Sequence, residues 1–381
     1  TATVTVVNEV WEQLDTGWAY TCGITNNGGG YCWGNNGNYN LGDGTTTDRS
    51  SPTSFDGSLN KTWASVSAHQ NHTCAVTTSG EGYCWGQNEN GRLGNGSTAN
   101  HETTPVLVSG GYTWESIQVG YRHTCGLTTG GDAYCWGENG DGQHGNGTTS
   151  SNGSSTPQAV NGSNLWSWES ISVGGEHNCA ITSLDTAKCW GEGDKGQVGV
   201  NSFGEQRSPN TSLAGAGVSD QDGGDMDFKY VGSGWLGSCG IDMNNEAYCW
   251  GYNGQGQIGD GTTENQKAAK SVSDPASGAV TWKTADMGES HACGVATSDV
   301  GYCWGNDGNW KLGSGNNSNA SIPTLVTGSH SWETIKPSRY HTCGLTTGGQ
   351  IYCWGDNRSG EGGSSSGTDT LTSPTLITDP Q

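Results

Sequence analysis

The chain has 381 residues, of which 37 are acidic and 15 are basic, so its formal charge at neutral pH is −22. A nucleic-acid-binding surface needs clustered Lys and Arg, and this balance therefore argues against DNA or RNA as a partner. No apolar run approaches the length of about 18 residues that a membrane-spanning segment requires. With 66 Gly and only 30% hydrophobic residues, the composition favours a turn-rich β protein whose core is built from its 17 Trp and 13 Tyr.

The first predicted element is a β-strand over residues 1–7. Its sequence, TATVTVV, alternates Thr and Val and contains no Gly or Pro. The chain starts at Thr1 without a Met or a signal-like stretch, as a mature, processed product would. The residues expected to form this strand, and to pair with another sheet, are Thr3, Val4, Thr5, Val6 and Val7.

A predicted hairpin with a Cys near each end follows, and it occurs seven times along the chain. In Cys74-AVTTSGEGY-Cys84, two β-prone arms flank a Gly-containing turn, so the two Cys face each other at a distance that a disulfide can bridge. Structural zinc sites favour CxxC pairs, and the sequence has none, so disulfides are predicted rather than a metal. Disulfides persist in oxidising compartments, and a secreted or cell-surface protein is therefore expected. The predicted bonds join Cys22 with Cys32, Cys74 with Cys84, Cys125 with Cys135, Cys179 with Cys189, Cys239 with Cys249, Cys293 with Cys303, and Cys343 with Cys353.

Aligning the chain on these pairs gives a repeat of roughly 50–60 residues. The fullest copy, residues 104–148, contains four extended stretches: PVLV, WESIQV, HTCGLT and AYCWG. Seven four-stranded units predict an all-β, seven-bladed β-propeller with one hairpin disulfide in each blade. A solenoid is the alternative, but the atypical capping units that it would need are not seen.

The text HTCAVTTSGEGYCWGQNENGRLGNG (residues 72–96) resembles the repeat of the regulator of chromosome condensation family. The resemblance covers nearly the whole chain and implies a seven-bladed propeller. It does not determine a function, because that family includes a nuclear exchange factor, secreted enzyme inhibitors and bacterial or archaeal surface proteins. The cysteines beside the CW motif resemble those of the secreted bacterial or archaeal branch, and this compartment argues against the nuclear role.

The candidate outer strands predict how the ring closes. An outer strand follows each CWG motif, led by a Pro in six units and formed by residues 267–274 in the fifth. Pro374-TLIT is predicted to complete the first blade beside Trp11-EQL, so that a strand near residues 373–378 closes a propeller of residues 8–381. Residues 1–7 are then a surplus arm, which lies on its own blade, replaces a weak strand there, or pairs with a neighbouring subunit to form a head-to-tail oligomer or filament. The six leading prolines are Pro52, Pro105, Pro157, Pro209, Pro323 and Pro374.

Function is best sought where the repeats differ. The position four residues before the first Cys precedes a strand in every unit, so its seven residues are predicted to lie on one rim: Trp18, Gln70, Tyr121, Gly175, Trp235, Glu289 and Arg339. Aromatic residues and Arg are typical of interface anchors, which favours a partner-binding rim. Alternatively, the aromatic residues only fill the mouth of the tunnel. The predicted rim residues are Trp18, Tyr121, Arg122, Trp235 and Arg339.

Residues that recur in most units are assigned to the architecture. The His two positions before the first Cys (His72, His123, His177, His291, His341) is expected to make a structural hydrogen bond, and the Trp after the second Cys is expected in the core between blades. Calcium is considered at the turns Gly42-DGT, Gly94-NGS, Gly145-NGT and Gly259-DGT and at Asp222, Asp225 and Asp227, but turns and a solvated loop are preferred, and no metal or cofactor is predicted. N-glycans could attach at ten sequons: Asn60, Asn71, Asn95, Asn146, Asn152, Asn161, Asn210, Asn316, Asn319 and Asn357.

Three classes of function follow. The first is a self-assembling or adhesive surface protein whose partner is another copy of itself, because the surplus strand favours assembly. The second is a secreted propeller that binds a different protein, because of the aromatic rim. The third is an enzyme, which is least supported because no nucleophile, carboxylate pair or metal constellation stands apart from the repeat.

Overall fold

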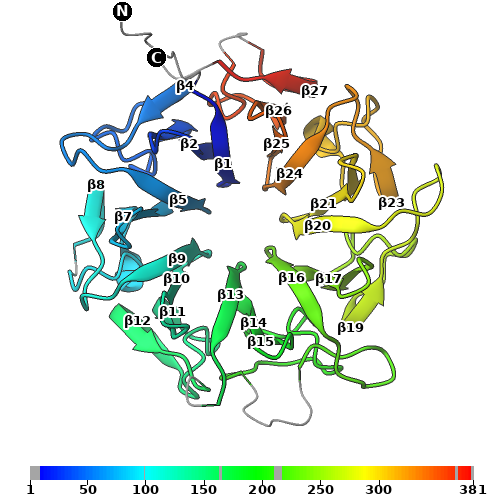
Figure 1. The fold of residues 1–381 in the computed structure, drawn as a ribbon, viewed down its shortest axis with the longest axis horizontal. Coiled ribbons are helices and arrows are strands. Elements are labelled where there is room, and N and C mark those ends of the chain that lie inside the picture. The colour runs from blue at the N-terminus through cyan, green and yellow to red at the C-terminus, as the bar shows by residue number, and fades with distance from the viewer. Residues whose placement is uncertain (1–8, 98, 163–164, 210–216, 365–367, 379–381) are drawn as a thin grey trace, which may run out of the picture.

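The computed structural model describes residues 9–97, 99–162, 165–209, 217–364 and 368–378. Its strands form seven antiparallel sheets arranged as a ring (Figure 1), so the predicted seven-bladed propeller is confirmed. Two short 3₁₀ turns, Glu89–Gly91 and Gly308–Trp310, are the helical segments of the described part. No helix among the described residues is long and apolar enough to cross a membrane.

Six blades have four strands and the fourth blade has three among the described residues. The strands are β1 Trp11–Thr16, β2 Tyr20–Thr25, β3 Gly30–Gly34 and β4 Arg49–Ser54 in blade 1; β5 Trp63–Ala68, β6 His72–Thr77, β7 Gly82–Gln87 and β8 His101–Leu107 in blade 2; β9 Trp114–Val119, β10 His123–Thr128, β11 Ala133–Asn139 and β12 Ser150–Ala159 in blade 3; β13 Trp168–Val173, β14 His177–Thr182 and β15 Ala187–Gly191 in blade 4; β16 Phe228–Ser233, β17 Gly237–Asp242, β18 Ala247–Gly251 and β19 Gln266–Ser271 in blade 5; β20 Trp282–Met287, β21 His291–Ala296, β22 Gly301–Gly305 and β23 Ala320–Leu325 in blade 6; and β24 Trp332–Pro337, β25 His341–Thr346, β26 Ile351–Asp356 and β27 Thr370–Leu376 in blade 7.

The paired cysteines lie directly opposite each other on the second and third strands of every blade. In blade 3, for example, Cys125 faces Cys135 in the register of β10 and β11. The Cα atoms of the seven pairs are 4.0–4.1 Å apart, and all fourteen cysteines are disulfide-bonded, so the predicted pairing is confirmed. In blade order the bonds are Cys22 to Cys32, Cys74 to Cys84, Cys125 to Cys135, Cys179 to Cys189, Cys239 to Cys249, Cys293 to Cys303, and Cys343 to Cys353.

The hydrophobic core is divided into seven clusters, one at each seam between neighbouring blades. The cluster between blades 5 and 6, for instance, combines Ile241 and Cys249 of one sheet with Trp282 and Met287 of the next. The Trp that follows each second Cys is fully buried, and its indole N–H donates to a loop carbonyl of the preceding blade, as Trp136 does to Arg92 at 2.9 Å. These residues join the blades, as predicted.

A glycine recurs in the loop after the CWG motif, and Gly94 shows why a larger residue does not fit there. Gly94 has a φ of +69°, and a Cβ atom at this position would lie 2.6 Å from the indole nitrogen of Trp136 in the next blade. Any side chain here would therefore displace the buried Trp.

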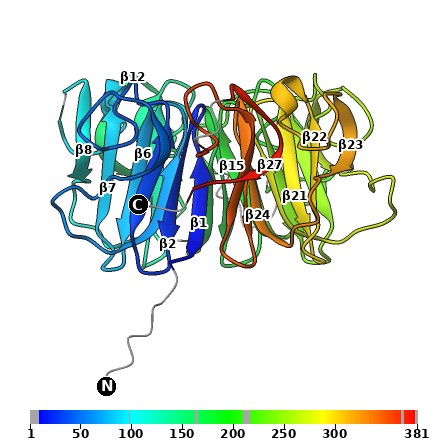
Figure 2. The same cartoon turned by 90° about the horizontal axis from the view of Figure 1, so that it is seen from above.

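The predicted closure of the ring is wrong. β27 pairs with β26, so the strand near residues 373–378 completes blade 7, whereas β1 to β4 complete blade 1. Each blade is built from consecutive strands, and the two ends of the chain meet as neighbouring sheets instead of sharing one sheet. Figure 2 shows β1 close to β24 at this junction. The packing of Trp11 and Leu14 against Leu345 and Ile351 closes the ring.

Two predicted strands fall outside the described residues. The N-terminal strand, residues 1–7, is one of them. The outer strand expected after Pro209 is the other, since residues 210–216 lie outside the described part of the chain.

Candidate functional site: the channel mouth

Three aromatic side chains from three different blades meet at one mouth of the central channel. Trp18 follows β1, Tyr121 follows β9 and Trp235 follows β16, so all three occupy the loop that leaves the innermost strand. The ring centroids of Trp18 and Tyr121 lie 5.7 Å apart with the planes nearly parallel, and Trp235 lies 4.6 Å from Tyr121 and 5.2 Å from Trp18. Such offset and edge contacts stabilise a ring pair by about 0.5–1.5 kcal/mol beyond the area that is buried.

Two arginines lie over this aromatic group. The Arg339 guanidinium is 4.1 Å from the Trp18 ring centroid and forms a salt bridge with Glu289 at 2.8 Å. Arg122 is 4.6 Å from the Tyr121 ring centroid, and 42% of its side chain remains exposed. We call Trp18, Tyr121, Arg122, Trp235 and Arg339 the mouth cluster. The structure brings all five predicted rim residues together at this end of the channel.

His69 belongs to the same site and was missed from sequence. The ring centroids of His69 and Trp235 lie 6.1 Å apart in a stacked arrangement, and the His69 main-chain carbonyl accepts a hydrogen bond from the Trp18 main-chain amide at 3.0 Å. Burial and the nearby His123 lower the pKa of His69 to about 3, so the imidazole is neutral. His69 lies five positions before Cys74, next to Gln70, which is the position that was compared between the repeats. No recurring His marks the His69 position in the other repeats.

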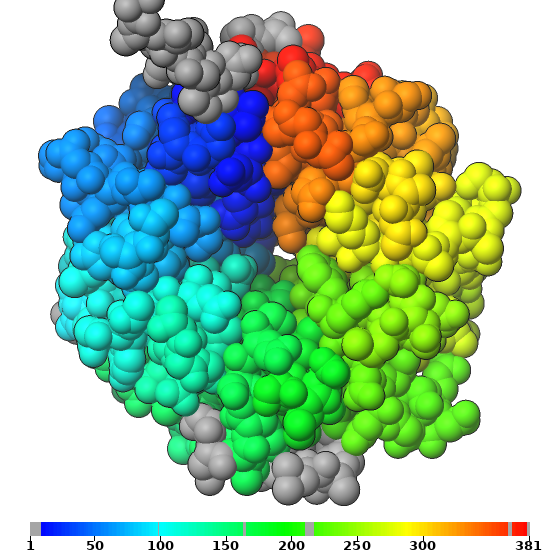
Figure 3. All heavy atoms as spheres, viewed as in Figure 1, coloured from blue at the N-terminus to red at the C-terminus, as the bar shows by residue number. Residues whose placement is uncertain are grey.

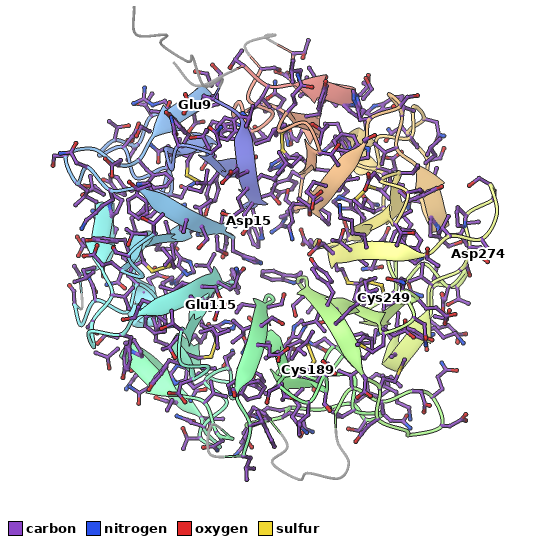
Figure 4. All side chains as sticks on the ribbon, in the orientation of Figure 1. Glu9, Asp15, Glu115, Cys189, Cys249 and Asp274 are labelled. Carbon is purple, nitrogen blue, oxygen red and sulfur yellow. A yellow bond between two sulfur atoms is a disulfide. The ribbon has the colours of Figure 1, made fainter. Side chains whose placement is uncertain are left out.

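Behind the mouth cluster, the channel contains a cavity of about 100 Å³ with polar walls. Inward-facing side chains of the innermost strands line it, including Asp15, Gln118, Ser172 and Asp286. Figure 3 shows one face of the ring, hollowed at its centre where the blades converge, and Figure 4 places Asp15 at the inner end of β1 beside this channel. The wall differs from blade to blade, because the innermost strands contribute different polar residues.

A basic residue, Lys336, is held inside the channel by an acid and a phenol. Its Nζ lies 3.0 Å from Asp286 Oδ1 and 3.5 Å from the Tyr230 hydroxyl, and that hydroxyl donates to the same carboxylate oxygen at 2.7 Å. Burial acts to lower the pKa of Lys336, but Asp286, Tyr230 and Asp15 together outweigh it, and the pKa is raised. Lys336 therefore acts as a fixed cation in this channel, not as a proton acceptor. The sequence carried a signal for this group, since charged residues occupy a position where other blades have Ser, Gln or Gly.

The repeated histidines link the blades, as predicted. Each His Nε2 is 2.8 Å from a polar side chain of the next blade, and the His123 to Asn178 bond is one example. The other pairs are His72 with Thr124, His177 with Ser238, His291 with Thr342 and His341 with Thr21. In blade 1, Tyr20 replaces His and its hydroxyl reaches Thr73 at 3.0 Å. The seam between blades 5 and 6 is different, because Gly237 and Ala292 stand at these two positions.

The turns considered for calcium use the side chains of their Asp or Asn to hold their own loops. Asp43 Oδ1 accepts hydrogen bonds from the Thr45 amide and hydroxyl and from Asn36, while Oδ2 pairs with Arg49. In the acidic loop, Asp220 accepts the amides of Asp222 and Gly224. Among the residues that the structure describes, no group of three or more His, Cys, Asp or Glu is arranged to hold a metal ion.

Fold and site together define a disulfide-stapled, seven-bladed propeller with an aromatic and arginine cluster at one end of its channel. Two profiles of the regulator of chromosome condensation (RCC1) repeat match the chain, one at residues 27–76, 79–127 and 130–181 and the other at residues 63–92, 114–143, 168–197 and 338–361. Together these matches cover just over half of the sequence, and the chain belongs to this repeat family.

Curated relatives share this repeat at modest identity. The ultraviolet-B receptor UVR8 of Arabidopsis thaliana is 27% identical over 298 residues, which cover 77% of this chain and 64% of the receptor. The human E3 ubiquitin-protein ligase HERC2 is also 27% identical, over 72% of this chain but only 6% of the ligase. This chain therefore spans less than two thirds of the length of both relatives.

Solved structures share the fold. Prp20p from Saccharomyces cerevisiae superposes with a TM-score of 0.77 at 20% identity, over 92% of this chain and 85% of that one. Human WBSCR16 superposes with a TM-score of 0.81 at 18% identity, over 92% and 94% of the two chains. At these identities the likeness establishes the architecture alone.

Proposed function

We propose that this chain is a non-enzymatic interaction propeller that binds a partner protein through the mouth cluster. The observation that carries the proposal is the convergence of Trp18, Tyr121 and Trp235 from three blades with two arginines at one surface. Blades 2 and 4 have Gln70 and Gly175 at the same repeat position, so a blade does not need an aromatic residue there. Aromatic residues and Arg dominate the energetics of protein interfaces.

The similar proteins support a binding role. The yeast propeller Prp20p binds Gsp1p and histones, and UVR8 is named as a receptor. We propose that this chain also binds a protein, and that it does so through the residues of the mouth cluster.

We place this interaction outside the cell, on a secreted or cell-surface protein of the disulfide-containing branch of the family. Seven disulfides in one chain support this location, because thiols of cytosolic proteins are kept reduced. The formal charge of −22 would also steer a basic partner surface toward this chain.

Site-specific photo-cross-linking tests the mouth cluster. A photoreactive phenylalanine at position 122 should capture a partner from the native extracellular fraction, whereas the same group at Lys229, at the opposite end of an innermost strand, should not. The captured protein is then purified, and its affinity is measured by calorimetry. Trp18→Ala and Tyr121→Ala should each weaken binding by at least about thirtyfold, the range of an interface hot spot. Equal capture at both positions, or unchanged affinity in both variants, would show that the mouth is not the binding surface.

A second candidate function is self-assembly through residues 1–7, which lie outside the described residues. The observation that favours it is that blade 1 has four strands in β1 to β4 and blade 7 has four in β24 to β27. In this proposal the strand-forming sequence Thr3 to Val7 pairs with a neighbouring copy, giving filaments or an adhesive layer. Light scattering and negative-stain imaging of the full chain should reveal strings of discs, and deletion of residues 1–7 should leave isolated discs. Assembly that survives the deletion rules this function out.

A further inference from the structure

The seam between blades 5 and 6 carries a second surface, distinct from the proposed partner site at the mouth. A groove there is lined by Trp235, Leu236 and Tyr252 of blade 5 and by Glu289, Ser290 and Asn306 of blade 6, with Gln255 between them. Of these residues, Trp235 alone also belongs to the mouth cluster. The groove therefore has its own set of residues that can be changed separately.

The repeat is interrupted at this seam more than at any other in the described structure. Six seams carry a hydrogen bond between the residue two positions before the first Cys and a polar side chain of the next blade. At the seam between blades 5 and 6, Gly237 and Ala292 occupy these two positions, and neither has a polar side chain. Met287 fills the space beside Gly237, because a Cβ atom on Gly237 would lie 2.7 Å from the Met287 sulfur. Leu236 and Tyr252 are further departures, because blade 3 has Arg and Glu at the corresponding positions. These departures from the repeat all lie at the seam between blades 5 and 6.

The two walls of the groove are fixed by main-chain hydrogen bonds. The Tyr252 amide donates to the Leu236 carbonyl at 2.8 Å on the blade 5 side, and the Asn306 amide donates to the Ser290 carbonyl at 2.9 Å on the blade 6 side. The Asn306 side-chain amide bridges the walls by donating to Gln255 Oε1 at 3.1 Å. The groove is thus formed before any ligand arrives, which reduces the entropic cost of binding.

The chemistry of the groove is aromatic and amide-rich, with balanced charge. Trp235 and Tyr252 present half-buried rings, and Gln255 and Asn306 present side-chain amides. Within the described residues, the Gln255 Nε2 group and the Tyr252 hydroxyl make no hydrogen bond, so donors remain for a ligand. The carboxylate in the groove, that of Glu289, is paired with Arg339 at 2.8 Å.

We propose that this groove binds a neutral saccharide. A sugar ring has an apolar C–H face that packs on an aromatic ring and a rim of hydroxyl groups that pair with amides, which is the combination that the groove offers. A charged ligand is disfavoured because Glu289 is already neutralised by Arg339. An apolar peptide side chain is disfavoured because it would bury the free Gln255 amide without a hydrogen bond.

The test uses four neutral oligosaccharides, namely cellohexaose, maltohexaose, chitohexaose and mannohexaose, with the full chain. Saturation-transfer NMR should detect binding of at least one of them, and calorimetry should then measure its affinity. Tyr252→Ala and Gln255→Ala should each weaken that binding by about tenfold or more, and Tyr252→Phe should retain most of it because the ring remains. Tyr39→Ala, in the corresponding loop of blade 1, is the matched control and should change the affinity less than about twofold.

The outcomes separate this site from the mouth cluster. Arg122→Ala removes a mouth-cluster side chain that does not line the groove, so it should leave saccharide affinity unchanged, and Tyr252→Ala should leave binding of the captured partner protein unchanged; either proposal can therefore fail alone. The saccharide proposal is overturned if none of the four oligosaccharides binds, if Tyr252→Ala binds as well as the unmodified chain, or if a random peptide library yields a ligand that requires Tyr252 while the sugars do not bind.

Discussion

His341 and Thr21 are joined side chain to side chain at 2.8 Å, although 320 positions separate them in the chain. The same hydroxyl donates to the Glu361 carbonyl at 3.0 Å, in the loop that also receives the Trp33 indole. Blade 7 is therefore fastened to blade 1 by the same polar contacts that fasten the other seams. None of the described strands is shared across this junction, so these contacts and the hydrophobic packing beside them close the ring.

Removal of the Thr21 hydroxyl should destabilise the whole propeller. Thr21→Val leaves the buried His341 Nε2 without a partner, which costs about 1–3 kcal/mol. The double variant Thr21→Val with His341→Phe should cost less than the two single changes together, because no unpaired polar group is left. Urea unfolding of the oxidised protein measures both, with Thr46→Val on the exposed surface as the control. A cost for Thr21→Val that is no larger than for Thr46→Val would show that the closing bond is not important.

Glu361 should make stability depend on pH. Its carboxylate accepts the Ser359 amide, as the neutral Gln257 side chain accepts the Gln255 amide in blade 5. Burial raises the pKa of Glu361 to about 7, above the usual 4.5. A raised carboxyl pKa means that the charged form destabilises the fold, so the penalty is fully present above pH 7 and disappears as the pH falls to about 4.5.

Glu361→Gln should therefore stabilise the protein at pH 8, by at most about 3 kcal/mol, and should have little effect at pH 4.5. Gln257→Glu is the reciprocal control and should destabilise the protein at pH 8 but not at pH 4.5. Unfolding free energies at the two pH values give the result. Equal effects of Glu361→Gln at both values would mean that the carboxyl is not perturbed in the folded state.

The sequence alone predicted the fold well, because the spacing of Cys74 and Cys84 marks two opposed positions of one hairpin, and seven copies count the blades. It failed at the closure of the ring. Pro374-TLIT can be placed beside Trp11 or beside Tyr352 by composition alone, and only the register of β26 and β27 selects the second.

The mouth cluster could also be predicted, because all units place that position in the same loop. The sequence marks Lys336 and Asp286 as charged exceptions at one repeat position, but their contact could not be predicted, because it depends on which face of each innermost strand points into the channel. A bulge after the first Trp of these strands shifts that register, as between Trp332 and Thr334 in β24. The sequence pattern does not reveal this shift.

Each hairpin disulfide should contribute to stability separately. Replacement of Cys125 and Cys135 by Ser removes a loop closure of ten positions, which should lower the free energy of unfolding by about 2–3 kcal/mol. The same replacement of Cys239 and Cys249 should cost more than this, because blade 5 also borders the seam that lacks the His hydrogen bond. Urea unfolding of the two variants makes the comparison. Identical losses would indicate that the seam between blades 5 and 6 is as strong as the others.

Prolines in the outer strands should keep the rim of the ring from pairing with other sheets. At the end of β23, the Val326 amide donates to the Gly301 carbonyl of the neighbouring inner strand. Backbone amides alternate in direction along a strand, so the main-chain nitrogens of positions 325 and 323 face away from the sheet. Pro323 has no N–H to offer there, and Pro105 and Pro374 stand at the same place in β8 and β27. Beside these prolines, Leu325, Leu107 and Leu376 are 53%, 54% and 47% exposed, and such residues on an edge strand would promote association.

Replacement of all three prolines by Val should therefore produce dimers and larger species that grow with concentration. Light scattering after size-exclusion chromatography measures this, and the chain without residues 1–7 is used so that the N-terminal strand cannot contribute. Pro275→Val, in a loop, is the control and should leave the mass unchanged. Adding Leu325→Lys to the triple variant should reduce the association again, because a charge on an edge strand opposes pairing. A triple variant with the same mass as the parent at every concentration would show that the outer strands are protected by some other means than their prolines.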